Sequence, residues 1–543
     1  MSDLLEELLQ THGPCLSTDL TRLLIEGQGL TADAARKRVS RRGLNVRRLA
    51  YIAFPRNVRF MYLQKDFGSP DYWDRLIKAL LDTGSAYGLA LAALRQRGGI
   101  MPSQHFPIAC GAPLRQSKHL SPETILERLQ KAQLLGTYDV PGVGSCIALV
   151  QGPDRYDAGN DEIRARLVTE AILLKAVRSW VQRLGLGSYD RVALRDETAE
   201  QPKVGTFSWD LSAPSYLGPM LDWSAAGRPK PGFIVCDVLL GVEVDEAGLR
   251  PFIYKSTTLR SLGRVGRCLQ VFVAERYTQA AFELAKKNGI VPATPDSLFG
   301  REVAEGLSQL VQLLTQAAHF AIRPEIFGEV FARLDRIEGA ATNLRGALFE
   351  FIAAEMARQM FSQHVRINAI FKASDGEKAE VDVLAEKINQ SVTFIECKGY
   401  QPFGTVPDGY IEKWLEKTIP LVYQEARRHP DWRSLKLHFE FWTTGRLSPE
   451  AISMISNAQK KIRPSRYTID YRDAEAVHTA ARELGDKGLL QTLEQHFLEH
   501  PMATVERDVG RRMVRSARSL ASKEAMEDAT FTEEYGIRTA KSS

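Results

Sequence analysis

The stretch AEVDVLAEKINQSVTFIECKGY, residues 379–400, decides the fold of the C-terminal part of this 543-residue chain. Residues 379–384 and 392–397 are rich in β-branched and other apolar side chains, which favours two strands. The polar residues 387–390 between them suit a tight turn. The stretch therefore predicts an antiparallel hairpin.

The turn also predicts which residues of the hairpin lie opposite each other. A turn centred on Asn389 places Asp382 opposite Glu396, with their Cβ atoms about 5 Å apart. Lys398 is two residues beyond Glu396 and so lies on the same face of its strand. Three charged side chains on one patch of an apolar hairpin are costly unless they bind something. Two carboxylates at this separation suit a hard divalent cation.

The segment before the hairpin, NLRGALFEFIAAEMARQMF (residues 343–361), predicts a helix, because apolar residues recur on one face at helical spacing. Glu350 is the acidic residue of this helix that we expect to belong to the same site as the charged residues of the hairpin. Glu355 is a rival for this role, since it lies nearer the middle of the apolar arc.

Together these residues resemble the signature of the PD-(D/E)XK nuclease superfamily: a helix Glu, an Asp at the start of a hairpin, and Glu-x-Lys on the next strand. Val381 stands where the family often has Pro. The similarity is greatest to Mrr-type restriction endonucleases and Holliday-junction resolvases and covers roughly residues 340–480. It is carried by the helix start Arg345-Gly346, by FIECKGY (394–400) and by FWTTGRLSPEAISMI (441–455).

This resemblance implies a mechanism. Asp382 and Glu396 would hold Mg2+ or Mn2+, with the Cys397 backbone carbonyl and Glu350 completing the shell, and the metal would activate water. Lys398 would act as a base or stabilise charge on the phosphate, and Gln401 would orient backbone or water. The alternative is an inactive descendant that keeps the fold for DNA binding, since Glu-x-Lys also occurs by chance.

Residues 160–320 show the same order of elements and suggest a degenerate copy of this domain. Glu170 corresponds to Glu350, and Asp210 corresponds to Asp382. Matching GFIVCDVLL to TFIECKGYQ places Val235 at the position of Glu396 and Asp237 at that of Lys398, which would break the metal site. An unrelated α/β domain is the alternative.

The N-terminal residues 3–65 predict three helices and then a hairpin around the turn 55–57, an order that resembles a winged helix-turn-helix domain. Residues 17–19 would cap the second helix, and Thr31 the third. The third helix and hairpin are strongly basic, with Asp33 as the only acid, which suits DNA phosphates. A basic face used for protein contact or dimerisation is the alternative. The predicted DNA-binding residues are Arg36, Lys37, Arg38, Arg41, Arg42, Arg47, Arg48, Arg56 and Arg59.

Residues 72–150 resemble a second, less basic copy of this domain, with a helix start at Ser121-Pro122. Elsewhere the sequence contains six scattered cysteines without a CxxC pair, no long apolar run and no secretion signal, which together suit a cytoplasmic protein. It contains no GxxxxGK[ST] motif, so we expect no nucleotide to be bound by this chain.

The sequence thus predicts a multidomain α/β plus α+β protein: two winged helix-turn-helix domains followed by two restriction-endonuclease-like α/β domains, the first degenerate. The expected function is Mg2+-dependent cleavage of DNA in restriction or mobile-element defence, by a homodimer or with a partner subunit. The alternatives are a non-catalytic DNA-binding regulator and a scaffold subunit of a defence or transposition complex. The expected domains are residues 1–68, 69–155, 156–325 and 326–500, followed by a basic tail, 501–543.

Overall fold

The computed structural model describes residues 4–41, 43–157, 160–197, 200–222, 230–317, 330, 333–334, 340–400, 404–463 and 466–498. The chain forms two compact units, and each is described by itself. The first contains residues 1–322, 329–347 and 366–382, and the second contains residues 323–328, 348–365 and 383–543. Both are mixed α/β. The predicted tail, 501–543, lies outside the described residues.

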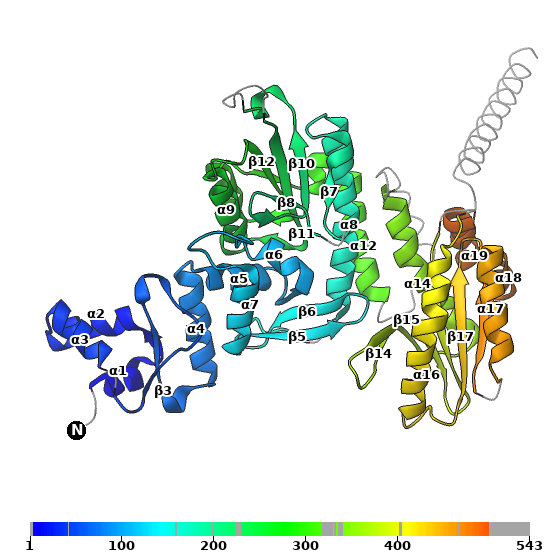
Figure 1. Cartoon of the computed structure of the whole chain (residues 1–543), viewed down its shortest axis with the longest axis horizontal. Helices are drawn as coiled ribbons and strands as arrows, with labels where there is room; N and C mark the ends of the chain where they lie inside the picture. The colour runs from blue at the N-terminus through cyan, green and yellow to red at the C-terminus, as the bar shows by residue number, and fades with distance from the viewer. Residues whose placement is uncertain are drawn as a thin grey trace, which may run out of the picture. The chain divides into compact units, whose positions relative to one another are not determined.

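The N-terminal domain consists of three helices and a three-stranded sheet (Figure 1). The strand order is β1-β3-β2 with both pairs antiparallel, and leucine and valine side chains from the helices pack against β2 and β3. Thr31 caps the third helix as predicted, by accepting a hydrogen bond from the Ala34 amide. The elements are α1 (Leu4–His12), β1 (Cys15–Leu16), α2 (Ser17–Gln28), α3 (Ala32–Ser40), β2 (Val46–Arg48) and β3 (Phe60–Leu63).

The predicted cap of the second helix is wrong. Helix α2 already includes Ser17, its N-cap residue is Leu16, and no side chain caps it. The Ser17 hydroxyl instead accepts a hydrogen bond from the Arg59 amide, which ties the start of the helix to β3. The Ser17 side chain thus bonds to a distant part of the chain and does not cap the helix.

A second helical domain follows, and its hydrophobic core is continuous with residues of the first domain. Tyr72 lies at its start and makes edge-to-face contacts with Phe60 and Tyr62 of the first domain. The boundary expected near residue 68 is therefore crossed by a shared aromatic core. Ser121 caps the last helix of this domain, as its sequence predicts. The elements are α4 (Pro70–Asp82), α5 (Ala86–Arg95), β4 (Ile100–Pro102), α6 (Phe106–Ala109), α7 (Pro122–Lys131), β5 (Leu135–Val140) and β6 (Gly144–Leu149).

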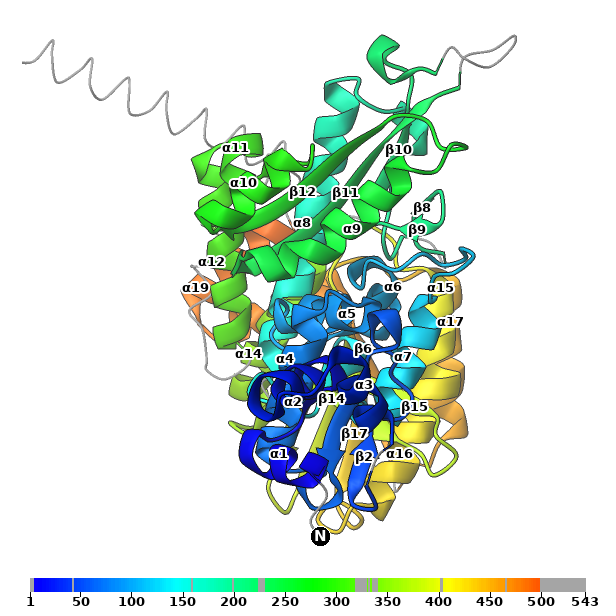
Figure 2. The same cartoon turned by 90° about the vertical axis from the view of Figure 1, so that its left-hand side faces the viewer.

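The third domain is built on the mixed sheet β13-β12-β11-β10-β7. Helix α8 packs on β11 and on α12, whereas α9 packs on β11 and β12 (Figure 2). Its elements are α8 (Asn160–Arg183), β7 (Ala193–Leu194), β8 (Lys203–Val204), β9 (Phe207–Ser208), β10 (Leu211–Ser215), β11 (Gly232–Val244), α9 (Glu246–Arg260), β12 (Cys268–Tyr277), α10 (Gln279–Lys287), β13 (Val291–Ala293), α11 (Pro295–Phe299) and α12 (Arg301–Ala317).

The C-terminal elements surround a sheet of order β14-β15-β16-β17-β18. A short π-helical segment, Trp414–Thr418, joins α15 to α16. The elements are α14 (Ala340–Met360), β14 (Val365–Lys372), β15 (Lys378–Lys387), β16 (Ser391–Lys398), α15 (Asp408–Lys413), α16 (Ile419–Arg428), β17 (Lys436–Thr443), α17 (Pro449–Lys461), β18 (Thr468–Arg472), α18 (Ala474–Glu483) and α19 (Lys487–Leu493).

The two five-stranded sheets share a topology. The pairs β10–β11 and β15–β16 are antiparallel hairpin-like pairs, and each is followed along the sheet by two parallel pairs. A long helix, α8 or α14, precedes each sheet in the sequence. The same order of elements along the chain thus gives the same order of strands in space.

Among the described residues, no helix has both the length and the apolar character needed to cross a membrane.

One histidine of the C-terminal sheet gives stability a pH dependence. Burial lowers the pKa of His438 below its ordinary 6.5, and its Nδ1 lies 2.7 Å from the Thr468 hydroxyl. The unfolded chain therefore takes up a proton at a higher pH than the folded chain, so stability is lost as pH falls below 6.5. We expect hydrogen exchange in Lys436–Thr443 to accelerate more between pH 7 and 5 in the wild type than in His438→Gln, after correction for intrinsic rates. Equal accelerations would contradict this.

Candidate functional site

The predicted register of the C-terminal hairpin is confirmed for the residues that pair. Val383 lies opposite Ile395, and the ladder continues to Lys387 opposite Ser391, so the turn is centred on Asn389. Asn389 adopts a left-handed conformation with φ of 57°, which turn residues of this type tolerate. A ladder extended by one position beyond Val383 and Ile395 pairs Asp382 with Glu396.

Lys398 lies directly on the groups that the sequence assigns to a metal. Its Nζ is 2.8 Å from Oε1 of Glu396 and 2.9 Å from the carbonyl oxygen of Cys397. The side chains of Glu396 and Lys398 are 19% and 23% exposed, so the ion pair is reachable from solvent. Strand β17 holds the backbone here, because the Thr443 hydroxyl and the Thr444 amide both donate to the Lys398 carbonyl.

The contacts of Lys398 show that a cation is accommodated beside Glu396 and the Cys397 carbonyl. The ammonium group is a cation, and it bonds to the carboxylate and the carbonyl oxygen that a divalent metal would use. Both are hard oxygen donors, the class that Mg2+ prefers. The oxygen donors that the structure describes on β16 are thus of the kind that Mg2+ binds.

The other predicted site residues fall in different places. Glu350 is half-buried in α14. Its rival Glu355 accepts hydrogen bonds from Arg358 and Gln359 of the same helix, and the side chains of Glu355 and Arg358 are 18% and 16% exposed. Gln401 lies outside the described residues. Within the described ranges, no three His, Cys, Asp or Glu side chains are grouped closely enough to hold a metal by themselves.

The third domain contains a buried charge cluster at the corresponding position, and its register corrects the sequence match. Leu211 lies opposite Cys236, so the next position pairs Asp210 with Asp237. Backbone contacts confirm that they are neighbours, since the Asp210 amide donates to Oδ1 of Asp237 at 3.1 Å. Asp237 is therefore the counterpart of Glu396, not of Lys398. The expectation that Val235 occupies that position was wrong by two residues.

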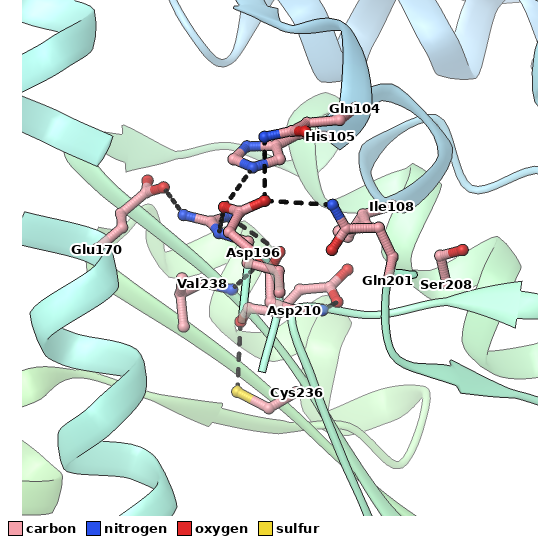
Figure 3. Close-up of polar contacts among 12 residues, drawn as sticks. Gln104, His105, Ile108, Glu170, Asp196, Gln201, Ser208, Asp210, Cys236 and Val238 are labelled. Carbon is pink, nitrogen blue, oxygen red and sulfur yellow. Dashed lines mark hydrogen bonds and ion pairs between the residues drawn. The ribbon is translucent and has the colours of Figure 1, made fainter. Parts of the chain in front are cut away.

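Two basic side chains pair with the three acids of a cluster that we call the buried charge cluster (Glu170, Arg195, Asp210, Asp237 and Lys255), and Arg166 Nε lies 3.9 Å from Glu170. The Arg195 guanidinium bridges Glu170 at 2.6 Å and Asp210 at 2.9 Å. Lys255 Nζ lies 2.5 Å from Oδ2 of Asp237. All five residues are buried. Figure 3 shows Glu170 and Asp210 approaching the same region from different elements.

Electrostatics within the cluster follow from this burial. Burial raises the pKa of Asp237 to about 6, although the neighbouring Lys255 ammonium acts in the opposite direction. Burial acts to lower the pKa of Arg195, but Asp210 and Glu170 outweigh it and raise that pKa. Arg195 is thus a permanent cation at the centre of the acids.

The second domain covers this cluster. Lys255 donates to the Ile108 carbonyl at 3.1 Å, and His105 lies 2.8 Å from Asp196, the neighbour of Arg195 (Figure 3). Gln104 adds a hydrogen bond to the same carboxylate. The position that corresponds to the C-terminal hairpin site is therefore closed by residues of another domain.

Sequence reasoning missed both cations of the buried charge cluster. Lys255 had a detectable signal, because it lies at helical spacing between Phe252 and Leu259 on the apolar face of α9. A lysine among such positions is rarely buried without a partner. Arg195 had no such signal, since it lies on an irregular segment next to β7.

The predicted DNA-binding residues of the first domain lie on α3, β2 and the segment before β3. All those described are exposed except Arg48, which is half-buried and donates to the carbonyls of Val39 and Ser40 at the end of α3. Arg47 bonds to Gln64 and to the Leu44 carbonyl. Arg42 lies outside the described residues.

Comparison with known proteins finds no protein-family model and no curated protein that matches this chain.

Proposed function

We propose that this chain is a Mg2+-dependent DNA endonuclease whose catalytic residues are Asp382, Glu396 and Lys398. The observation that supports this most strongly is the position of the Lys398 ammonium next to the Glu396 carboxylate and the Cys397 carbonyl, at the end of a hairpin that is paired as far as Val383 and Ile395. The resemblance of these residues to the PD-(D/E)XK signature also supports the proposal. In that signature Glu350 is a further acidic residue of the metal site.

Each residue has a distinct task in this proposal. Asp382, Glu396 and the Cys397 carbonyl bind Mg2+, which supplies charge stabilisation for the phosphate and lowers the pKa of water. The two oxygens of Glu396 and Cys397 that Lys398 contacts would be ligands of a bound Mg2+, and the Lys398 ammonium would then be available to a phosphate. There it stabilises the charge that develops during attack, or takes a proton from the attacking water.

The remaining domains position the nucleic acid. The exposed basic residues of α3 and the segment before β3 suit a phosphate backbone, in the manner of a winged helix-turn-helix domain. The third domain is a closed copy of the nuclease fold in which Arg195 and Lys255 neutralise the acids. Restriction of foreign DNA or defence against mobile elements is the proposed setting, with a second copy or partner supplying the second strand cut.

Removal of the metal tests the proposal. We expect the full chain with Mg2+ or Mn2+ to cut supercoiled plasmid or a branched DNA junction, and we expect an excess of chelator to abolish this. Gel electrophoresis separates nicked from linear plasmid, and the ratio shows whether the strands are cut in concert. Binding without cutting on either substrate, in both metals, would favour the non-catalytic regulator. Cutting that persists in chelator would contradict the role of Asp382 and Glu396.

A further inference from the structure

An arginine-lined pocket lies in the first domain, between the start of α2, the end of α3 and the segment around residues 56–61. Its volume is about 520 Å³. Four guanidinium groups line it, from Arg36, Arg48, Arg56 and Arg59. Ser17 and Thr18 also line it. Among the described residues that line the pocket, none is acidic.

The polar groups of this pocket are incompletely satisfied. The Nε of Arg48 is buried and has no hydrogen-bond partner in the described part of the chain, although the same guanidinium is held by the carbonyls at the end of α3. The Arg48 guanidinium is therefore only partly matched by acceptors of the described chain.

The turn that presents Arg56 is itself strained. Arg56 and Asn57 both have left-handed backbone conformations, with φ of 56° and 59°. Such conformations are unfavourable for residues other than glycine, and they are often found where a loop holds a ligand. Here the turn directs an exposed arginine to the edge of the pocket.

The chemistry of the pocket selects a phosphate with more than one negative charge. One guanidinium group can bind two phosphate oxygens at once. The four arginines of the pocket carry more positive charge than is needed to balance the single negative charge of a phosphodiester. The volume falls within the usual range of about 300–1,000 Å³ for small-molecule sites. A phosphate within a continuous duplex lies on a ridge bounded by its neighbours, whereas a terminal phosphate can enter a concave pocket.

We propose that this pocket binds a phosphomonoester carried by a nucleoside, either at the end of a DNA strand or on a free mononucleotide. For a DNA end this inference rests on the proposed function, because DNA is then the polymer that the chain holds. Hydrolysis of a phosphodiester by water leaves a phosphomonoester on one new end and a hydroxyl on the other. The pocket therefore has the chemistry to hold one product of the proposed reaction.

The test measures binding in chelator, so that cleavage plays no part. Fluorescent duplexes with a 5′-phosphate, with a 3′-phosphate or with hydroxyl ends only are titrated with the full chain at near-physiological salt. We expect one phosphorylated end to bind about tenfold more tightly than the hydroxyl end. The double variant Arg56→Ala/Arg59→Ala should reduce this preference to less than about twofold.

A matched control is the double variant Lys37→Ala/Arg41→Ala, which removes two exposed charges from the same domain outside the pocket. It should weaken binding to all duplexes equally and leave the preference intact. Circular dichroism checks that both variants are folded. Competition by a deoxynucleoside monophosphate at concentrations similar to the phosphorylated duplex would identify the free nucleotide as the ligand. Weak competition would identify the DNA end.

Two results would overturn the inference. One is equal binding of all duplexes by the wild type together with no competition by the mononucleotide, which leaves the proposed nuclease function standing. The other is a preference that survives Arg56→Ala/Arg59→Ala. Absence of binding to any duplex and to the mononucleotide would contradict both this inference and the proposed DNA-binding role of the domain.

Discussion

Lys398→Ala is expected to lower the rate of DNA cleavage by about a hundredfold or more, while DNA binding stays close to that of the wild type. The reason is that the Lys398 ammonium lies next to two of the proposed metal ligands, at 2.8 Å from Glu396 and 2.9 Å from the Cys397 carbonyl. Removing one such group from a site where charge develops usually costs two to three orders of magnitude. Single-turnover cleavage and equilibrium binding measure the two quantities separately.

The matched control is Lys387→Ala, at the exposed end of β15 in the same hairpin. It removes an identical charge at the turn end of the hairpin, where Lys387 pairs with Ser391, and this variant should cut DNA at the wild-type rate. A loss of activity shared by both variants would point to general electrostatics and not to a catalytic lysine. Full activity of Lys398→Ala would remove the proposed catalytic site.

The hairpin could be predicted because its information is local. A polar turn separates two short apolar segments, and the period of two along a strand then fixes which residues share a face. The observed pairing of Val383 with Ile395 follows from the position of Asn389 alone. Charged residues at defined places in such a hairpin are visible in the sequence, and so were the candidate residues Asp382, Glu396 and Lys398.

The register of the third domain could not be predicted in the same way. Strand β11 is 13 residues long, and Ile234 to Leu240 are buried without interruption, so no alternation distinguishes its two faces. The segment between β10 and β11 also exceeds a tight turn, and its middle lies outside the described residues. With neither turn nor alternation to set the register, the match to the later strand slipped by two residues.

The cations of the buried charge cluster illustrate a further limit. Lys255 and Asp237 are 18 residues apart, and Arg195 and Glu170 are 25 residues apart. No local pattern connects such residues, because the fold alone brings them together. The two sheets differ in where their cations come from. One keeps its lysine two residues after the acid on the same strand, while the other takes cations from a helix and an irregular segment.

The second large effect is expected in the third domain: Arg195→Met should destabilise it by about 3–5 kcal/mol. The guanidinium is 6% exposed and bridges Glu170 and Asp210, which are 3% and 1% exposed. Methionine fills much of the same volume but leaves two buried carboxylates without their shared cation. Native-state hydrogen exchange in peptides from β10 and β11 gives the free energy of opening of this part of the sheet directly.

Arg178→Met provides the control, because Arg178 pairs with Glu197 in the same domain at 2.8 Å but with side chains 28% and 37% exposed. Water can replace that partner, so its loss should cost less than about 1 kcal/mol. If both variants cost the same small amount, Arg195 would not be the cation that holds the acids together. A selective cost at Arg195 would mean that the third domain depends on a side chain where its C-terminal counterpart is proposed to bind a metal. That difference explains why one copy would be structural and the other catalytic.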